Sequence, residues 1–268
     1  MDRLKINDMM ELLAVPSCTY HEQKLIEYIS GILDSKGYNY TIDNIGNIYI
    51  TKGEAEAYPL VLAHTDTVHA MEEMYIAEES LPDYNGEYKD ALKAYTVDGD
   101  YPTGIGGDDK AGIFICLQLL EQCDVLKVFL PVSEELGCIG TDASDPEFFE
   151  DVLYAIAFDS TEGNTCSRTL MGTELFTEGE YFINTSDVIL QEHGFTEWHE
   201  HPYTDVMILR ERHGFECLNL AAGYYDYHTV NEYVVIDDVE NAIVAGKKII
   251  DSLNTSRLIE FANEGLLC

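Results

Sequence analysis

Two adjacent carboxylates stand on a glycine-rich turn in the middle of the chain. Asp108 and Asp109 belong to residues 104–112, Gly-Ile-Gly-Gly-Asp-Asp-Lys-Ala-Gly, and an apolar stretch typical of a buried helix, residues 111–120, follows them. Neighbouring acids at the start of a buried helix repel each other, so something positive is expected to compensate them. Aspartate is also a common helix cap. The stretch by itself therefore leaves two interpretations open, a cation site and a helix cap.

Other acids and histidines follow short apolar runs. The runs at 59–63, 125–132 and 153–158 are too short for helices and are typical of buried strands. The chemically active residues directly after them are His64, Glu134, Glu135 and Asp159. Asp108 and His228 fall in loops that lead from a strand towards a helix. If these strands are parallel, all six side chains meet at one edge of a sheet.

The order of elements predicts such a sheet. A further buried strand is expected at 217–222, and the apolar spacing predicts helices at 6–14, 20–33, 110–122, 205–213 and 237–253. Strands alternating with helices indicate an α/β protein, a three-layer sandwich with a largely parallel, doubly wound mixed sheet. In this class of fold, ligands bind beyond the carboxyl ends of the strands.

Several local features accompany this prediction. Thr19 and Glu22 have the spacing of a capping box for the second helix. Residues 38–42 and 48–51 predict a hairpin, whereas the acidic, weakly periodic segment 69–103 predicts an irregular excursion with one hairpin. Residues 197–203, which include the only tryptophan, predict an ordered loop near the rim of the site.

The residues at the expected sheet edge are metal ligands by type. Carboxylate oxygens and imidazole nitrogens bind zinc, manganese and cobalt. The candidate ligands are His64, Asp108, Glu135, Asp159 and His228. These five ligands exceed the number that one catalytic zinc ion takes. Two metal ions that share Asp108 as a bridging carboxylate therefore fit better. Asp66 can hold the second ring nitrogen of His64, and Glu134 remains free to accept a proton from water.

These segments resemble, in order, the metal-site motifs of the M20 metallopeptidases, the family of peptidase T and the glutamate carboxypeptidases. The matching segments are His64-Thr-Asp-Thr-Val68, Gly106-Gly-Asp-Asp-Lys-Ala-Gly112, Ser133-Glu-Glu-Leu-Gly137, Ala157-Phe-Asp159 and His228-Thr-Val-Asn-Glu-Tyr-Val234. The resemblance implies that His64 and Asp159 hold one zinc ion, that Glu135 and His228 hold the other, and that Asp108 bridges them. It also implies Glu134 as general base, Asp66 as the residue that orients His64, and a cis peptide between Asp108 and Asp109.

The chain departs from the family in one respect. M20 enzymes insert a lid or dimerisation domain of roughly a hundred residues between the equivalents of Asp159 and His228, whereas only residues 160–227 intervene here. We therefore expect one catalytic domain, residues 1–268, without a separate lid. This layout is closer to the M28 aminopeptidases, whose motif Tyr227-His-Thr229 resembles. Arg168 is a candidate to bind a substrate carboxylate in place of the lid, and a surface ion pair is its alternative.

Composition restricts the partners. The chain has 50 acidic and 15 basic residues, a net charge of −35, which repels nucleic acids and anionic membranes. Its seven cysteines contain no CxxC pair and are expected to be reduced thiols. Neither a signal peptide nor a run of about 18 apolar residues is present, so we expect a cytoplasmic protein.

Together these features predict an enzyme, a hydrolase that cleaves a terminal amide or peptide bond with water activated by two divalent metal ions. Zinc is expected, with cobalt and manganese as alternatives. The predicted activity is that of an exopeptidase, an aminopeptidase or a dipeptidase acting on small peptides. Two alternatives stay open: a deacylase or amidase acting on acyl amino acids, and a binding module without catalysis. The sequence makes no prediction about the oligomeric state.

Overall fold

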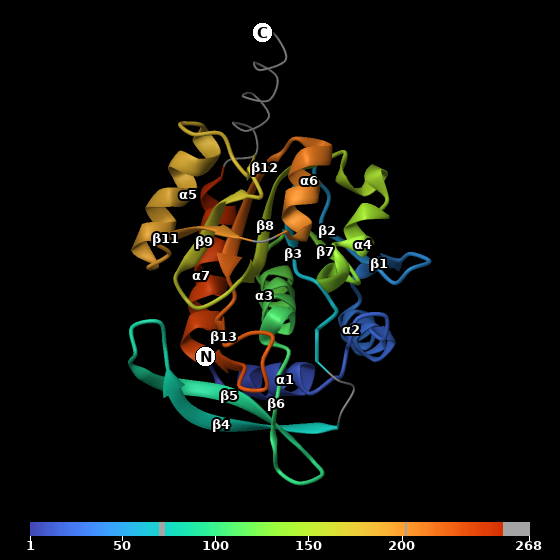
Figure 1. Ribbon diagram of the computed structural model, residues 1–268. Helices are drawn as coiled ribbons and strands as arrows, with labels where there is room; N and C mark the ends of the chain where they lie inside the picture. The colour runs from blue at the N-terminus through green and yellow to red at the C-terminus, as the bar shows by residue number, and fades with distance from the viewer. Residues whose placement is uncertain (70–72, 202, 254–268) are drawn as a thin grey trace, which may run out of the picture.

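The computed structural model describes residues 1–69, 73–201 and 203–253, and its main feature is a mixed sheet with helices on both faces (Figure 1). The strands follow one another across this sheet in the order β1 (Asn39–Ile42), β2 (Ile48–Lys52), β7 (Leu126–Leu130), β3 (Tyr58–Leu62), β8 (Val152–Ser160), β12 (Glu216–Ala221), β9 (Thr165–Leu170) and β10 (Thr173–Glu174), and β11 (Glu197–His201) pairs with β9.

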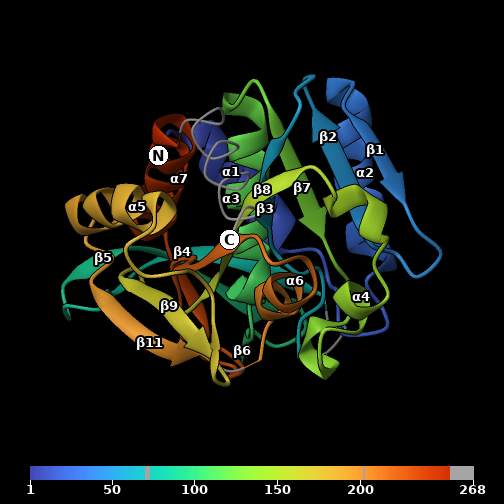
Figure 2. The same cartoon turned by 90° about the horizontal axis from the view of Figure 1, so that it is seen from above.

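The helices form a layer on each face of the sheet. One layer contains α1 (Arg3–Leu13), α3 (Gly107–Gln122), α5 (Tyr181–Glu192) and α7 (Ile236–Ser252), and the opposite layer contains α4 (Ile139–Asp142) and α6 (Asp205–His213), as the view from above in Figure 2 shows. The remaining long helix, α2 (Gln23–Lys36), buries Leu25, Ile29 and Leu33 in the same core. The predicted α/β class with a largely parallel mixed sheet is confirmed.

The centre of the sheet is parallel and its edges are antiparallel. β7, β3, β8 and β12 run in the same direction, whereas β2 and β9 run against them. Every residue of β3 and β7 is buried, because helices cover both faces. The carboxyl ends of the four central strands therefore meet at one edge. Asp159 is the penultimate residue of β8, and His64, Ser133 and Ala222 follow the ends of the other three strands within a few residues.

A smaller sheet lies beside this core. It contains β13 (Tyr224–Tyr225), β14 (Tyr233–Val235), β5 (Tyr88–Thr96) and β4 (Met74–Pro82), with β6 (Pro102–Thr103) paired to β5. The one hairpin predicted within 69–103 is confirmed, because β4 and β5 pair from Met74 with Thr96 to Pro82 with Tyr88, and this part of the segment is therefore regular and not irregular. Residues 70–72 lie outside the described residues. β4 is partly exposed along its whole length, so it lacks a clear apolar alternation.

The predicted capping box is also wrong. The second helix begins at Gln23, and Glu22 at its N-cap makes no capping hydrogen bond from its side chain. The Thr19 hydroxyl instead donates to Asp66 Oδ2 at 2.8 Å, and Glu22 Oε1 accepts from the Ser133 amide at 3.1 Å. Tertiary partners near the candidate site thus replace the local pairing.

Other local predictions have mixed outcomes. The hairpin at 38–52 and the helix at 205–213 are confirmed. The predicted ordered loop at 197–203 is instead largely a strand, β11, in which Trp198 packs edge-on against Phe176, and Pro202 lies outside the described residues. The buried cysteines are free thiols: Cys116, Cys123, Cys138, Cys166 and Cys217. Cys268 lies outside the described residues. Within the described chain, no helix is both long and apolar enough to cross a membrane.

Candidate metal centre

The carboxyl ends of β3 and β8 bring a histidine and an aspartate to the start of α3. His64 is 1% exposed, and its Nε2 lies 3.0 Å from Asp108 Oδ1 and 3.6 Å from Asp159 Oδ1. The three donor atoms lie within 4.8 Å of one another. Three segments that are distant in the sequence, 64, 108 and 159, therefore supply one compact group of ligand types.

The second oxygen of Asp108 faces another such group. His228 Nε2 lies 3.1 Å from Asp108 Oδ2 and 2.9 Å from Glu135 Oε1. Glu135 belongs to the short 3-10 helix η1 (Glu134–Leu136) after β7, and His228 stands in the loop between β13 and β14. Asp108 thus has one carboxylate oxygen in each of the two groups, as a bridging ligand requires.

The donor set fits two zinc-like ions. Zinc binds nitrogen and oxygen donors at about 2.0–2.2 Å, so two donors on one tetrahedral ion lie about 3.4 Å apart. The separations of 3.0 and 3.6 Å in the His64 group, and of 3.1 and 2.9 Å in the His228 group, bracket or approach that value. The assignment of these five residues as ligands stays a prediction, and the observed donor types and distances support it.

Electrostatics shows how strongly these carboxylates need a positive partner. Burial disfavours the charged form of His64, yet hydrogen bonds to Asp108, Asp159 and Asp66 raise its pKa well above the ordinary value. Hydrogen bonds to Asp108 and Glu135 raise the pKa of His228 to about 10. Burial alone would raise the pKa of Asp108, but its two histidine partners lower it. The imidazoles therefore supply the positive charge that bound cations would otherwise provide.

Asp66 holds this group together. The Nδ1 atom of His64 lies 2.9 Å from the main-chain carbonyl oxygen of Asp66 and 3.4 Å from its carboxylate. Asp66 Oδ1 also accepts from the Glu134 amide at 2.8 Å, and Oδ2 accepts from the Thr19 hydroxyl at 2.8 Å. Asp66 thus orients the His64 ring, leaving Nε2 towards Asp108, and also fixes the turn that carries Glu134.

Glu134 faces the same pocket without being part of either ligand group. Its side chain is largely buried and accepts a weak hydrogen bond from Cys138 Sγ at 3.5 Å. Burial, together with the charges of Asp159, Asp205 and Asp108, raises the pKa of Glu134 to about 10. Cations bound at the two ligand groups would offset these negative charges and lower the pKa of Glu134, towards the carboxylate form that a general base needs.

The two neighbouring aspartates of the glycine-rich turn have different roles. Asp108 belongs to both ligand groups, whereas Asp109 Oδ1 accepts from the Gly112 amide at 3.2 Å and Oδ2 accepts from the His64 amide at 3.2 Å. A Cβ atom at Gly112 would lie 2.3 Å from both Asp109 Oδ1 and the Phe158 carbonyl, so this close approach requires glycine. The peptide bond between the two aspartates is cis, as the resemblance implied.

Glu232 is a supporting residue that sequence reasoning did not single out. Its side chain is fully buried, Oε1 accepts from the Asp108 amide at 2.9 Å, and Oε2 accepts from the Gly106 amide at 2.9 Å. His69 Nε2 lies 2.5 Å from the same Oε2 atom. Glu232 therefore fixes the backbone of the glycine-rich turn. The signal that could have found it is its place four residues after His228, in the last of the five matching segments.

Replacing Glu232 with glutamine is expected to destabilise the fold. An amide has one acceptor oxygen where the carboxylate has two, so one buried backbone donor loses its partner, at a cost of about 1–3 kcal/mol. The midpoint of urea denaturation should fall while its slope stays unchanged. The exposed Glu150→Gln variant is the control, with a change within about 0.5 kcal/mol. An unaltered midpoint for Glu232→Gln would contradict the role of Glu232.

Arg168 does not join this arrangement. It lies on β9, its side chain is half exposed, and it forms an ion pair with Glu178. Its pocket also contains Phe176 and Trp198, whereas the residues lining the pocket of the metal centre are Asp108, Glu134, Glu135, Gly137, Asp159, Tyr203, Thr204, Tyr227 and His228. The structure therefore favours the surface ion pair over a role in binding a substrate carboxylate.

Comparisons with known proteins relate part of the chain to a peptidase. No family model matches the chain. The cytosol non-specific dipeptidase of Escherichia coli strain K12 is 32% identical over 143 residues. This alignment covers 48% of the present chain and 28% of the dipeptidase, so the chain spans under a third of that protein's length.

Solved structures match over nearly the whole chain. Aminopeptidase PepT from Bacillus cereus has a TM-score of 0.75 at 16% identity and covers 92% of this chain and 97% of its own. A tripeptidase from Staphylococcus aureus has a TM-score of 0.71 at 14% identity, with coverage of 92% and 96%. An aminopeptidase from the archaeon Desulfurococcus kamchatkensis has a TM-score of 0.67 at 13% identity, with coverage of 95% and 96%. The chain therefore has the fold of these peptidases.

Proposed function

We propose that this protein is a metal-dependent exopeptidase or dipeptidase that hydrolyses a terminal peptide bond. The observation that carries the proposal is the position of Asp108, whose two oxygens lie 3.0 and 3.1 Å from the Nε2 atoms of two histidines from distant segments, His64 and His228. The similarity to a dipeptidase and the fold shared with aminopeptidases support the reaction class.

The residues that would hold two divalent ions are the two groups already described. His64 and Asp159 would bind one ion, Glu135 and His228 the other, and Asp108 both. Zinc suits these nitrogen and oxygen donors, and cobalt and manganese accept the same set. When bound, such ions acidify water and polarise a carbonyl group.

Glu134 performs the proton transfers in this proposal. Its carboxylate accepts a proton from the attacking water and afterwards donates that proton to the nitrogen of the departing amine. Asp66 keeps the His64 ring and the turn of Glu134 in place through hydrogen bonds from both. Tyr203 and Tyr227 line the same pocket of about 230 Å³.

We further propose that the described residues, 1–69, 73–201 and 203–253, form one catalytic domain without a separate lid. The segment between Asp159 and His228 contains β9, β10, α5, β11, α6, β12 and β13. Strands β9 to β12 pair within the main sheet, and β13 pairs with β14 in the smaller sheet. The described residues of this segment therefore continue the catalytic fold. The cytoplasmic location predicted from the sequence agrees with the cytosolic name of the related dipeptidase and stays a prediction.

Metal removal is expected to lower the melting temperature. Without cations, the carboxylates of the buried Asp108 and Asp159 and of the partly buried Glu135 repel one another, so bound metal should stabilise the native state. At a metal concentration of about 1,000 times Kd the stabilisation is about 4 kcal/mol, and about 2–4 °C per kcal/mol gives a shift of roughly 10 °C. Calorimetry before and after EDTA treatment measures it. An unchanged melting temperature for protein that contained metal would count against this stabilisation.

The proposed activity is tested with matched substrates. Purified protein with added zinc, cobalt or manganese is given Leu-Gly, Leu-Gly-Gly, N-acetyl-Leu-Gly and N-acetyl-leucine, and free amines are quantified. An exopeptidase that recognises the N-terminus hydrolyses the unblocked peptides and spares the acetylated ones. Release of acetate from N-acetyl-leucine would instead assign a deacylase, and no product with any metal would overturn the enzymatic proposal.

A further inference from the structure

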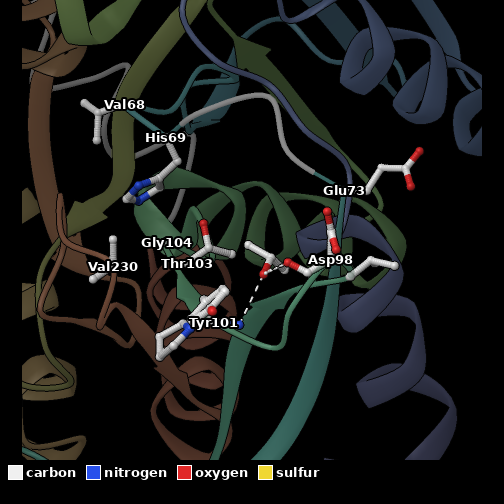
Figure 3. Close-up of a pocket in the computed structure, with 11 residues that line it drawn as sticks. Val68, His69, Glu73, Asp98, Tyr101, Thr103, Gly104 and Val230 are labelled. Carbon is white, nitrogen blue, oxygen red and sulfur yellow. Dashed lines mark hydrogen bonds between the residues drawn. The ribbon is translucent and has the colours of Figure 1, made fainter.

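A cavity of about 660 Å³ lies next to the metal centre and takes no part in the proposed chemistry. Figure 3 shows it between the turn from β5 to β6, residues 96–103, and the loop before β14 that carries Val230. Its volume falls within the range of about 300–1,000 Å³ that is typical of small-molecule sites. The cavity is therefore large enough for an amino-acid side chain or more.

Apolar side chains make up much of the wall although solvent reaches them. Val68 is 43% exposed, Val97 58%, Tyr101 69% and Val230 58%. Exposed apolar residues that gather around one hollow mark a binding site more often than scattered ones do. The Tyr101 amide donates to Thr96 Oγ1 at 3.2 Å, so the turn that carries two of these residues is held by hydrogen bonds.

Apart from His69, which pairs with Glu232, the charged side chains of the wall are acidic. Glu73 and Asp98 lie on the side of the cavity opposite Val68, His69 and Val230 in Figure 3. No lysine or arginine is among the described residues that line the cavity. An uncharged or positively charged group can enter such a cavity, whereas a carboxylate is repelled.

The cavity and the metal centre share their supporting residues. His69 lines the cavity and binds Glu232, which accepts from the amide of Asp108. The ring of His69 fills the space above Gly104, where an added Cβ atom would lie 2.0 Å from it. Val230 is two residues from His228, so their Cα atoms are at most about 7 Å apart. A peptide residue next to the scissile bond is therefore within reach of the cavity.

We infer that this cavity binds an apolar or basic side chain of the peptide substrate, on a residue next to the scissile bond, and rejects an acidic one. The inference rests on the proposed peptidase function. It names a substrate class that the metal centre alone does not define: short peptides with a large aliphatic or basic residue beside the cleaved bond.

The test compares one filled cavity with one matched control. Val230→Trp places an indole in the cavity, and Val188→Trp makes the same change on α5 at a valine that is 60% exposed, against 58% for Val230. Substrates are tri-alanine and its variants with leucine, lysine or glutamate at each position in turn. For wild type, kcat/KM at the responsive position should be about tenfold or more higher for leucine and lysine than for glutamate. Val230→Trp should reduce this preference at least fivefold, and Val188→Trp should preserve it.

A substitution that reverses a charge in the cavity wall is the second test. Asp98→Lys should raise kcat/KM for the glutamate peptide relative to the lysine peptide by several-fold, because it reverses one of the charges that faces the bound side chain. Circular dichroism establishes that each variant is folded before its kinetics are compared. The inference would be overturned if both Val230→Trp and Asp98→Lys hydrolysed the leucine, lysine and glutamate peptides with the same relative kcat/KM values as wild type.

A binding measurement separates this inference from the proposed function. Hexylamine and hexanoate have the same apolar tail and opposite charges, and their binding to the wild type, Val230→Trp and Val188→Trp is followed by calorimetry. Binding of hexylamine alone, lost only in Val230→Trp, supports the assigned chemistry of the cavity without any turnover. The same binding in a protein that hydrolyses no peptide would overturn the assignment to a peptide residue together with the peptidase proposal. Hydrolysis without hexylamine binding would overturn the inference alone.

Discussion

Replacing Asp108 with asparagine is expected to abolish hydrolysis and the binding of both metal ions. One oxygen of this carboxylate faces His64 and Asp159, and the other faces His228 and Glu135. Asparagine has nearly the same shape but supplies one neutral oxygen, so one ion loses a ligand and the other keeps only a neutral, weaker one. The loss of several kcal/mol of transition-state stabilisation corresponds to about a thousandfold or larger decrease in kcat/KM.

A matched variant makes the Asp108 result specific. Asp124 is exposed in the short connection between α3 and β7, at the opposite end of that strand from the metal centre, and Asp124→Asn makes the same chemical change there. It should keep wild-type metal content and activity. Metal content is measured by mass spectrometry on the same samples as the kinetics. Full metal content and full activity in Asp108→Asn would disprove the bridging role.

Replacing Glu134 with glutamine is expected to separate catalysis from metal binding. Glu134 faces the pocket but belongs to neither ligand group, so the variant should retain both metal ions. Glutamine accepts no proton from water, and the loss of a general base typically costs about 10²–10⁴ in rate. We therefore expect kcat to fall within or beyond this range while KM changes little.

The conservative variant distinguishes proton transfer from a structural role. Glu134→Asp retains a carboxylate at a shorter reach and should recover part of the activity that Glu134→Gln loses. Glu147→Gln, at an exposed position of the following 3-10 helix η2 (Pro146–Phe149), is the matched control and should behave as wild type. If Glu134→Gln kept wild-type kcat with bound metal, another group would have to carry the proton.

The clustering of the candidate ligands follows from topology, and topology was readable in the sequence. His64 follows the fully buried strand β3, Asp159 is the penultimate residue of the largely buried strand β8, and parallel strands end at the same edge of a sheet. Because the position of a strand end constrains the position of the next side chain, residue type and strand order were enough to predict this group. His228 was a candidate by residue type, but its loop joins β13 to β14 and does not lead from a strand to a helix as expected, and its grouping with Glu135 depended on the family resemblance.

The double aspartate shows where sequence reasoning had to leave alternatives open. A helix cap and a cation site were both consistent with the glycine-rich turn, and the structure gives one role to each residue. Asp109 caps the helix through the Gly112 amide, while Asp108 faces the histidines. The sequence could not show which aspartate has which role. The roles depend on the directions of the two side chains, and Asp108 and Asp109 have non-helical backbone angles at the start of α3.

The supporting hydrogen bonds were beyond prediction for a different reason. Glu232 and Asp108 are 124 residues apart, and their contact joins a carboxylate to a backbone amide, which has no residue type to recognise. Thr19 and Glu22 were assigned to a local capping box, yet both contact residues of the candidate site. Local spacing rules describe isolated helices, and buried tertiary partners override them.

One hairpin was predicted within 69–103, but the bounds and regular pairing of β4 and β5 were not, because their side chains are mostly polar or half exposed. Apolar alternation identifies a strand when one face is buried, but β4 is at least partly exposed at every position. Its stability comes from pairing with β5, which in turn pairs with β14 and contacts α7. This hairpin carries the turn that forms one wall of the cavity, so the cavity was also unpredictable from the sequence.

The measurement that tests the central claim most directly is the number of metal ions per chain. Purified protein is stripped with EDTA, incubated with zinc, cobalt or manganese, freed of excess metal and analysed by inductively coupled plasma mass spectrometry beside native mass spectrometry of the intact chain. We predict about two ions per chain in the wild type. A chain that retains none of the three metals would contradict the account, and the matching motifs would then mark a fold without metal-dependent catalysis.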